Sequence, residues 1–461
     1  SGSNTMKVIK FGGSSLTDAE SYHRVKELLI KEKEDKVLVL SAMQGITKEL
    51  QKAIKKALKE EDEVEKIIKE ISKKHQIVAT QAIRNSEILS DILERIEKKM
   101  KRLERLLYGI NYTEEVTAKS RDMILSFGER LSVHIMEGIF RSEGIKSCAM
   151  EADEIGIITD GEFGNSTADL KSTRKNLKKN IGHVLDKGII PVVTGFFGQS
   201  KDGYTTLFGF GGSDYTAGII ACSLDSSVVE VWKDVDGFMS ADPKLVPGAH
   251  FIDRLSYAEA AELAYFGAKI LHPRIVQPIE PRAIPIVIKN AYNPDLTGTI
   301  IEKEGYQKED VIKSVACSKD IGVIKIEGVG IGYKPGVLSS MASAISNHGI
   351  NIKSVITAQT SINIILDMED LDDCHKMLKK HHSTAVEDVV KIEDEALIGV
   401  VGEGMATTKG LAARVFRAIA EEHVNVDMIS YGASQVAFYL IVKEEYLERA
   451  VKAVHREFFK V

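Results

Sequence analysis

The chain has 461 residues, of which 44% are hydrophobic and 28% charged, the composition of a folded globular protein. Its net charge of −6 gives no reason to expect nucleic acid as a partner, and no run of about 18 apolar residues is present to span a membrane. The chain is longer than a domain built around one hydrophobic core usually is, so we expect two or three domains.

The termini and cysteines indicate a cytoplasmic protein. The N-terminus lacks the apolar core of a signal peptide, and residues 1–5 are expected to be a cloning remnant before the native Met6. The four cysteines lie far apart and form no Cys-x-x-Cys pair, which predicts buried free thiols in a reducing cytosol and neither a disulfide framework nor a zinc site.

The first motif is a short apolar strand over residues 7–11 that breaks at Gly12 and Gly13. Lys10 lies at the break, and the hydroxyl of Ser14 follows it. Glycines let backbone N–H groups approach a ligand closely, and a helix N-terminus adds positive potential, a combination that suits a phosphate. The residues alone fit a plain strand-turn-helix corner with an exposed lysine equally well, and the spacing is not that of a Walker A loop.

Residues 36–41 form a second apolar run, typical of a buried parallel strand, and a loop of small residues over 41–47 follows it. Ligands bind at such strand ends in open α/β sheets. Residues 48–110 are rich in helix formers and carry an apolar stripe at helical spacing. We expect this long helical excursion to pack against its own domain in preference to a partner.

The segment 122–132 is predicted to be helical, with Gly128 and Glu129 in its middle. A glycine inside a helix costs up to about 1 kcal/mol relative to alanine, so it suggests that another group approaches closely there. Taken alone, Glu129 and Arg130 fit a solvated charge pair better than a binding site.

A second glycine-rich loop lies at residues 205–216, ahead of an apolar helix over 217–224. Ser213 or Asp214 is expected to cap that helix. The glycines at 209, 211 and 212 exceed what a cap requires, so the loop is a candidate second phosphate clamp, with Asp214 orienting Lys10 or a metal-bound phosphate.

The next strand, residues 227–232, leads into a polar loop at 233–244 on the same ligand edge. A helix is predicted over 257–271, with Lys269 near its end, and the apolar run 284–290 closes the domain. Strands alternating with helices predict an α/β sandwich for residues 6–300.

The C-terminal part contains an internal repeat in which Gly336, Asn351 and Leu366 each recur 74 residues later. The sequence pattern of each copy predicts the ferredoxin-like order β-α-β-β-α-β. The second copy lacks a fourth strand, and we expect residues 311–317 to supply it. The first copy, residues 318–392, is then inserted into a second domain made of 311–317 plus 393–461.

With these motifs in place, the sequence resembles the aspartate kinases of the amino-acid kinase superfamily over nearly its whole length. The resemblance implies a three-layer α/β/α kinase domain followed by two ACT domains, the feedback modules of these enzymes. The motifs that carry it, in family order, are residues 10–16 (KFGGSSL), 41–47 (SAMQGIT), 126–132 (SFGERLS), 211–215 (GGSDY), 234–237 (DVDG), 241–243 (ADP) and 266–273 (FGAKILHP).

The resemblance implies transfer of the γ-phosphoryl of ATP to the side-chain carboxylate of L-aspartate, the first step toward lysine, threonine and methionine. Lys10 and Asp214 would be catalytic, and Mg²⁺ would be held mainly by ATP oxygens, with no dedicated protein metal site. The aspartate pocket would be formed by Ser41, Thr47, Glu129 and position 210. The implied ATP-binding residues are Lys10, Phe11, Gly12, Gly13, Ser14, Gly211, Gly212, Ser213, Lys233, Asp234, Met239, Lys244 and Lys269. Met239 and Lys244 stand where the family often has an aromatic residue and an arginine.

One departure from the family concerns Phe210, which replaces an arginine that grips the α-carboxylate of aspartate. Phenylalanine cannot form that bidentate, charge-assisted bond. Three explanations are open: another basic residue takes over the contact with the α-carboxylate, the substrate is a different small carboxylate, or the kinase is impaired and the protein serves as an amino-acid sensor. We favour the first explanation because Thr47 and Glu129 are retained.

The resemblance further implies an amino-acid effector, lysine above all, at the ACT domains of a homodimer or larger oligomer. A pair of ACT domains used only for dimerisation is the alternative. The expected effector pocket comprises Met341, Asn351, Ile352, Thr357, Ala358 and Gln359.

Overall fold

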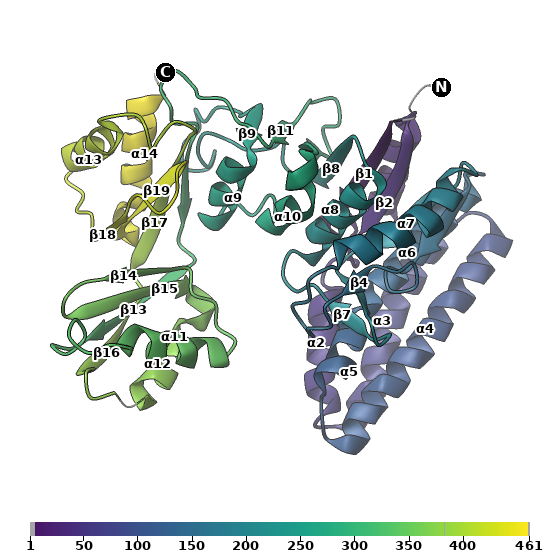
Figure 1. The fold of residues 1–461 in the computed structure, drawn as a ribbon. Helices are drawn as coiled ribbons and strands as arrows, with labels where there is room; N and C mark the ends of the chain where they lie inside the picture. Colours follow the sequence, from purple (N-terminus) through teal and green to yellow (C-terminus); the bar gives the residue numbers. More distant parts are fainter. Residues whose placement is uncertain (1–4, 382, 460–461) are drawn as a thin grey trace. The chain divides into compact units, whose positions relative to one another are not determined.

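The computed structural model describes residues 5–381 and 383–459. It divides into two compact units (Figure 1). The first unit holds residues up to 237 together with 253–257 and 270–304. The second holds residues 238–252, 258–269 and the chain from 305 onward. Two short stretches that we expected within the catalytic domain therefore cluster with the C-terminal repeats.

An eight-stranded sheet is the centre of the first unit. Its strands are parallel except where β10 and β11 run antiparallel. In spatial order they are β3 (Ser147–Met150), β5 (Ile190–Thr194), β2 (Asp35–Leu40), β1 (Met6–Phe11), β8 (Val228–Lys233), β10 (Ile286–Asn290), β11 (Thr299–Glu302) and β9 (Arg254–Ser256). Because β1 lies between β2 and β8, the ends of three consecutive apolar strands bring their loops to one edge.

Helices cover both faces of this sheet, as predicted for a three-layer α/β/α fold (Figure 1). On one face, α8 (Gly212–Leu224) packs on β1 and β8, with α7 (Leu170–Leu185) and α10 (Val276–Ile279) beside it. On the other, α6 (Phe127–Ser142) packs on β2, β3 and β5, and α1 (Ala19–Lys31) lies against α6. A small sheet of β4 (Ile158–Thr159), β6 (Phe197–Ser200) and β7 (Thr205–Leu207) completes the unit.

The helical excursion forms α2 (Ile46–Ala57), α3 (Glu61–Ala82) and α4 (Ser86–Thr113). The apolar stripe of α4 is buried at Ile92, Ile96, Met100, Leu103 and Leu107. Helix α4 packs on α3 and α6, which confirms that the excursion covers its own domain.

The helix predicted over 122–132 is broken at Ser126 into α5 (Ala118–Leu125) and α6. The Ser126 hydroxyl donates to the Met123 carbonyl at 2.6 Å, and such side-chain bonding competes with the helical pattern. Gly128 and Glu129 therefore lie in the first turn of α6, not in the middle of a helix.

The second unit contains two four-stranded antiparallel sheets with the predicted repeat. The first copy comprises β13 (Ile321–Glu327), α11 (Val337–Asn347), β14 (Ser354–Thr357), β15 (Ser361–Asp367), α12 (Leu371–Lys380) and β16 (Asp388–Ile392). The second comprises β17 (Glu395–Val401), α13 (Leu411–Glu421), β18 (Met428–Ser430), β19 (Ala437–Lys443) and α14 (Leu447–Phe458).

The missing strand of the second copy is β12 (Ser314–Ser318), which pairs antiparallel with β17. This pairing confirms that the piece before the first copy completes the sheet of the second. The expected strand began three residues earlier, and Val311 instead has a positive φ of 57°.

Helix α9 (Tyr257–Tyr265) ends six residues before the predicted boundary, because Gly267 adopts a φ of 109°. Lys269 therefore does not lie on a helix. The loop after α9 fits the second repeat closely, since a Cβ at Gly399 would collide with the ring of Phe266. Within the same unit, the buried ammonium of Lys313 pairs with Glu259 of α9 at 2.8 Å.

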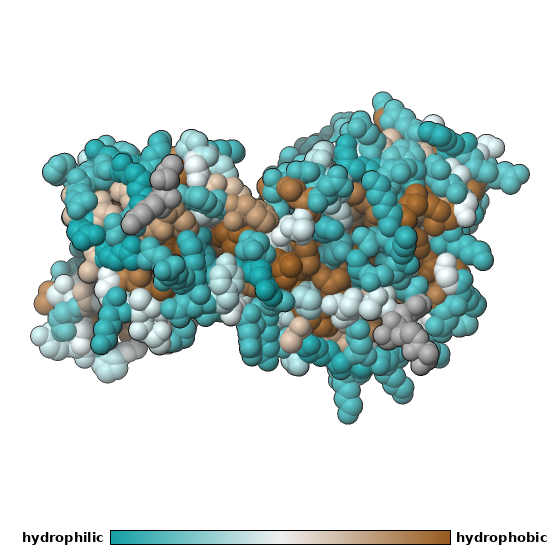
Figure 2. All heavy atoms as spheres, turned by 90° about the horizontal axis from the view of Figure 1, so that it is seen from above, coloured by the Kyte–Doolittle hydropathy of each residue, from teal (hydrophilic) through white to brown (hydrophobic). Residues whose placement is uncertain are grey.

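Hydrophilic side chains cover most of the face seen in Figure 2. Within the described residues, no helix is both long and apolar enough to cross a membrane. All four cysteines are free thiols, as predicted. Cys374 is buried in the core of the first repeat, but Cys148, Cys222 and Cys317 are only half-buried, so the expectation that all four are buried is wrong.

Candidate active site

The centre of the candidate site is an ion pair between Lys10, at the end of β1, and Asp214, in the first turn of α8. The Lys10 Nζ lies 2.6 Å from the Asp214 Oδ1, and both side chains are buried. The other Asp214 oxygen accepts the backbone N–H of His272 at 2.9 Å. The two glycine motifs, 204 residues apart in sequence, therefore meet through this pair.

A second lysine faces the same point. Lys233, the last residue of β8, lies near Gly12, where a Cβ would be 3.5 Å from the Lys10 Nζ and 4.0 Å from the Lys233 Nζ. Burial acts to raise the pKa of Asp214, but Lys10 and Lys233 outweigh it and hold that pKa at about 2. Burial, together with the charge of Lys10, lowers the pKa of Lys233. Two cations against one carboxylate leave an excess of positive charge for an anion.

The second glycine loop is positioned by the segment after α9. Helix α8 begins at Gly212 with Gly211 as its N-cap, so the expected cap by Ser213 or Asp214 is wrong. Gly211 has a φ of 73°, and a Cβ there would collide with the imidazole of His272. Only glycine combines this conformation with this closeness. His272 and its contact with Asp214 were missed by our sequence reasoning, although the motif at 266–273 includes it.

Glu129 is a buried carboxylate with one unsatisfied oxygen. Its Oε1 accepts the backbone N–H of Ala42 at 3.2 Å, whereas its Oε2 has no hydrogen-bond partner among the described residues. Burial raises the pKa of Glu129 to about 8. The interpretation of Glu129 and Arg130 as a solvated pair is therefore wrong, and an incoming cation would satisfy the free oxygen.

Arg130 points to a different network. It donates to Asp153 at 2.5 and 3.1 Å and to Glu151, and its guanidinium lies 4.5 Å from the centre of the Phe197 ring. This network fixes the start of α6, and with it Glu129, against the small sheet.

The loop over residues 41–47 contacts both the first glycine corner and Glu129. A Cβ at Gly128 would lie 2.6 Å from the Ala42 Cβ, which explains the glycine beside Glu129. A Cβ at Gly13 would lie 3.2 Å from the Ala42 carbonyl oxygen. Ser41 and Thr47 flank this contact and are half-buried.

Phe210 does not line a closed pocket. Its side chain is 87% exposed, and its ring makes an edge contact with His272 at 5.1 Å between ring centres. The remaining residues expected to bind ATP lie in different settings. Phe11 is buried and stacks on Trp232. Ser14 is exposed in the turn Gly13–Ser15, and Asp234 is exposed after β8. The other three belong to the second unit, namely Met239, Lys244 and Lys269.

The first repeat contains a small cavity of about 250 Å³ beside the start of α11. Two of the residues expected at the effector site, Thr357 and Ala358, line this cavity, and the Gln359 carbonyl beside it accepts the Gly332 N–H at 2.9 Å. Met341 is a core residue only 1% exposed, and Asn351 and Ile352 do not line this cavity. The residues that sequence reasoning missed here are Ile331, Gly332, Lys334, Gly336, Val337, Leu338 and Ile362.

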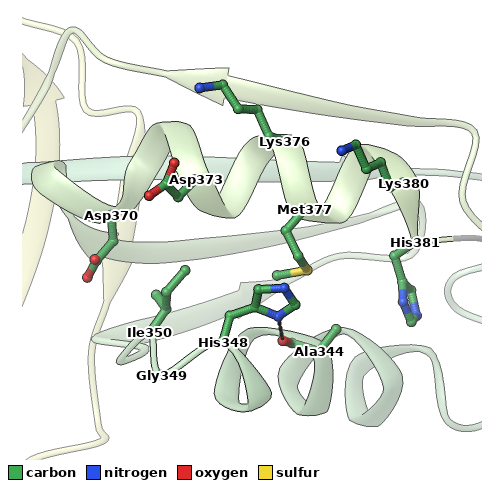
Figure 3. Close-up of a pocket in the computed structure, with 10 residues that line it drawn as sticks. All are labelled: Ala344, His348, Gly349, Ile350, Asp370, Asp373, Lys376, Met377, Lys380 and His381. Carbon is green, nitrogen blue, oxygen red and sulfur yellow. Dashed lines mark hydrogen bonds between the residues drawn. The ribbon is translucent and has the colours of Figure 1, made fainter. Parts of the chain in front are cut away.

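A wider groove of about 610 Å³ lies between α11 and α12 on the helical side of the same repeat (Figure 3). Asp370 and Asp373 lie toward one end of α12 and Lys380 toward the other, with Met377 between them (Figure 3). No expected effector residue lines it. Its charged side chains are largely open to solvent.

Comparison with known proteins agrees with this geometry. Residues 5–290 match the model of the amino acid kinase family, and residues 324–381 and 398–458 each match an ACT domain. Aspartokinase 2 of Arabidopsis thaliana, a chloroplastic protein, is 33% identical over 98% of this chain and 84% of its own length. The chain belongs to the aspartokinases. These enzymes use ATP to phosphorylate the side-chain carboxylate of aspartate.

Solved aspartokinases share the fold. Escherichia coli aspartokinase III in complex with aspartate and ADP is 26% identical, with a TM-score of 0.82 over 99% of this chain and 100% of that one. The same enzyme in complex with lysine and aspartate gives a TM-score of 0.85 at the same identity and coverage. The Clostridium acetobutylicum aspartate kinase is 27% identical, with a TM-score of 0.75 and the same coverage.

Proposed function

We propose that Lys10 and Lys233 bind the phosphates of ATP and that Asp214 holds Lys10 toward the transferred phosphoryl group. The excess positive charge around Gly12 supports this assignment. The backbone N–H groups of Gly12, Gly13, Gly211 and Gly212, with the hydroxyls of Ser14 and Ser213, complete the phosphate cradle.

In the reaction, a side-chain carboxylate oxygen of aspartate attacks the γ-phosphorus as the bond to the β,γ-bridging oxygen breaks, and ADP leaves. The carboxylate is ionised at neutral pH, so no general base is required. The chain contributes position and positive charge, and Lys10 stabilises the charge that develops on the phosphoryl oxygens.

Mg²⁺ would be held chiefly by the phosphate oxygens. No group of three or more metal-ligating side chains occurs within the described ranges, and Asp214 is already occupied by Lys10 and the His272 N–H. This donor set fits a cation that arrives with its nucleotide and keeps several waters, which is the usual behaviour of Mg²⁺.

We propose that Glu129 receives the ammonium group of aspartate, with Ser41 and Thr47 on the same side of the substrate. The unsatisfied Glu129 oxygen is the observation that supports this role. The nucleoside would contact the end of β8 and the loop after it, at Lys233 and Asp234.

The effector is proposed to be lysine, bound at the cavity lined by Thr357 and Ala358. The lysine complex of the E. coli enzyme supports this choice. Lys353, in the stretch before β14, would repel the ammonium group of a lysine ligand if its own charge were free, but it pairs with Asp367 at 3.0 Å. We further propose a cytoplasmic homodimer or larger oligomer formed through the ACT domains, with domain boundaries at 6–300, 318–392, and 311–317 plus 393–461.

One assay tests this function. Purified protein with ATP, Mg²⁺, aspartate and hydroxylamine is expected to yield aspartyl hydroxamate, and added lysine is expected to reduce the yield more than threonine or methionine does. Asp214→Asn is the matched negative control. Absence of hydroxamate from the native protein would contradict the kinase assignment, and equal yields with and without lysine would contradict the effector.

A further inference from the structure

The second glycine loop lacks a cation where aspartate must be gripped. Phe210 lies between Gly209 and Gly211, whose φ angles are 80° and 73°, and its exposed ring carries no charge. Aspartate has two carboxylates, and Lys10 and Lys233 face the phosphate side. The α-carboxylate therefore needs another positive group.

Arg274 is a cation that contacts this loop next to Phe210. Its guanidinium donates to the Phe208 carbonyl, two residues before Phe210, and to the Ser166 carbonyl at 2.5 Å. It lies 4.2 Å from the centre of the Tyr215 ring, in the first turn of α8. Arg274 also follows His272 by two residues, so the same short segment contacts both Asp214 and the loop.

Within the described part of the chain, Arg274 forms no ion pair with a carboxylate. All of its hydrogen-bond partners among the described residues are neutral, the third being the Asn165 side-chain oxygen at 3.5 Å. Arg130 and Arg174, by contrast, each pair with an acidic side chain. A guanidinium has five N–H groups, and these three bonds leave two of them available.

We propose that Arg274 supplies the positive charge that selects the α-carboxylate of aspartate, in place of the arginine absent at position 210. The inference rests on the proposed function, since it assumes that aspartate is the substrate. Arg274 is then a specificity-determining residue. It also holds the loop through Phe208, so its two roles must be separated by experiment.

The test compares Arg274→Gln, Arg274→Lys, Phe210→Arg and the double variant Phe210→Arg with Arg274→Gln, using steady-state kinetics for both substrates. Arg274→Gln is expected to raise the KM for aspartate by about tenfold, the size of a lost charge-assisted bond, with kcat and the KM for ATP within about twofold. Arg274→Lys keeps the positive charge, and its KM for aspartate is expected to lie between those of the native protein and Arg274→Gln. In the double variant, the KM for aspartate is expected to return most of the way to the native value. Arg282→Gln is the matched control, because Arg282 pairs with exposed Asp225 away from the site.

An unchanged KM for aspartate in Arg274→Gln would overturn the proposal. A loss shared by kcat and both KM values that Phe210→Arg does not rescue would also overturn it, because a purely structural role predicts that pattern. If Arg274→Gln does not fold, the comparison uses Arg274→Lys with and without Phe210→Arg. A lower KM for aspartate after Phe210→Arg is added supports the role of positive charge at this loop, and an unchanged KM contradicts it. Failure of the native protein to phosphorylate aspartate is a separate result that contradicts the proposed function itself.

Discussion

The proposed phosphate side and the proposed aspartate side of the site are built in opposite ways. On the phosphate side, Lys10 and Asp214 are buried and already paired before any ligand arrives. On the aspartate side, Glu129 has an unsatisfied oxygen, and Phe210 is exposed. The first arrangement is preorganised, whereas the second, on our proposal, is completed by the substrate.

Removing Lys10 tests the preorganised side and should have the largest effect. Lys10→Met is expected to lower kcat by roughly 10²–10³-fold, because a cation directed at developing charge is lost and Asp214 stays buried without its partner. Thermal unfolding of the variant checks that the fold survives. Lys36→Met, on the neighbouring strand β2, is the control and should leave kcat unchanged. A loss under tenfold would show that Lys10 is not the principal cation.

Removing the charge of Glu129 tests the side completed by substrate. Glu129→Gln is expected to raise the KM for aspartate by about 10- to 100-fold and to change the KM for ATP little, because an ammonium group loses its buried carboxylate partner. Initial rates with each substrate varied in turn make the comparison. Equal changes in both KM values would argue against a direct contact with aspartate.

Restoring arginine at Phe210 should strengthen the aspartate side. Phe210→Arg is expected to lower the KM for aspartate by about tenfold in the Arg274→Gln background, since a bidentate carboxylate contact becomes possible on an exposed loop. In the native protein the decrease is expected to be smaller, because Arg274 is proposed to hold the α-carboxylate already. Phe210→Leu is the control for loss of the aromatic ring. An unaltered KM in Phe210→Arg would mean that the α-carboxylate is already fully held by another group.

The pH dependence gives the smallest effect and still distinguishes the two sides. With a pKa of about 8, Glu129 is mostly protonated at pH 7 in the free protein, so kcat/KM for aspartate should rise severalfold between pH 7 and 8.5. Asp214, with a pKa of about 2, does not titrate in this range. Glu129→Gln should abolish the rise, and a rise that persists in this variant would assign it to another group.

The same carboxyl affects stability. The folded protein keeps the Glu129 proton above the ordinary pKa of 4.5, so Glu129 favours folding at low pH, and this contribution is lost as the pH rises toward about 8. Without aspartate, Glu129→Gln should therefore unfold at a higher temperature than the native protein at pH 8.5 and at a similar one at pH 4.5. Calorimetry at the two pH values measures the difference, and a shift of equal size at both would contradict this cause.

The sequence predicted that the two glycine motifs meet through Lys10 and Asp214, because glycine pairs after apolar strands can be recognised directly in the sequence. The 74-residue repeat likewise predicted that β12 completes the second ACT sheet. Glu129 was misread from its neighbours, since burial depends on the contact between Gly128 and Ala42, 86 residues apart. The early end of α9 and the contact of the His272 N–H with Asp214 depend on tertiary packing that no local pattern contains.

The division of the chain has a consequence for modularity. The polypeptide passes between the two units after residues 237, 252, 257, 269 and 304. A fragment that starts at 305 would lack Glu259 and leave the Lys313 ammonium buried without its counter-charge. A chimaera that keeps a working regulatory module must therefore transplant 238–252 and 258–269 along with it, so exchange of these modules at a single gene junction should yield unstable proteins.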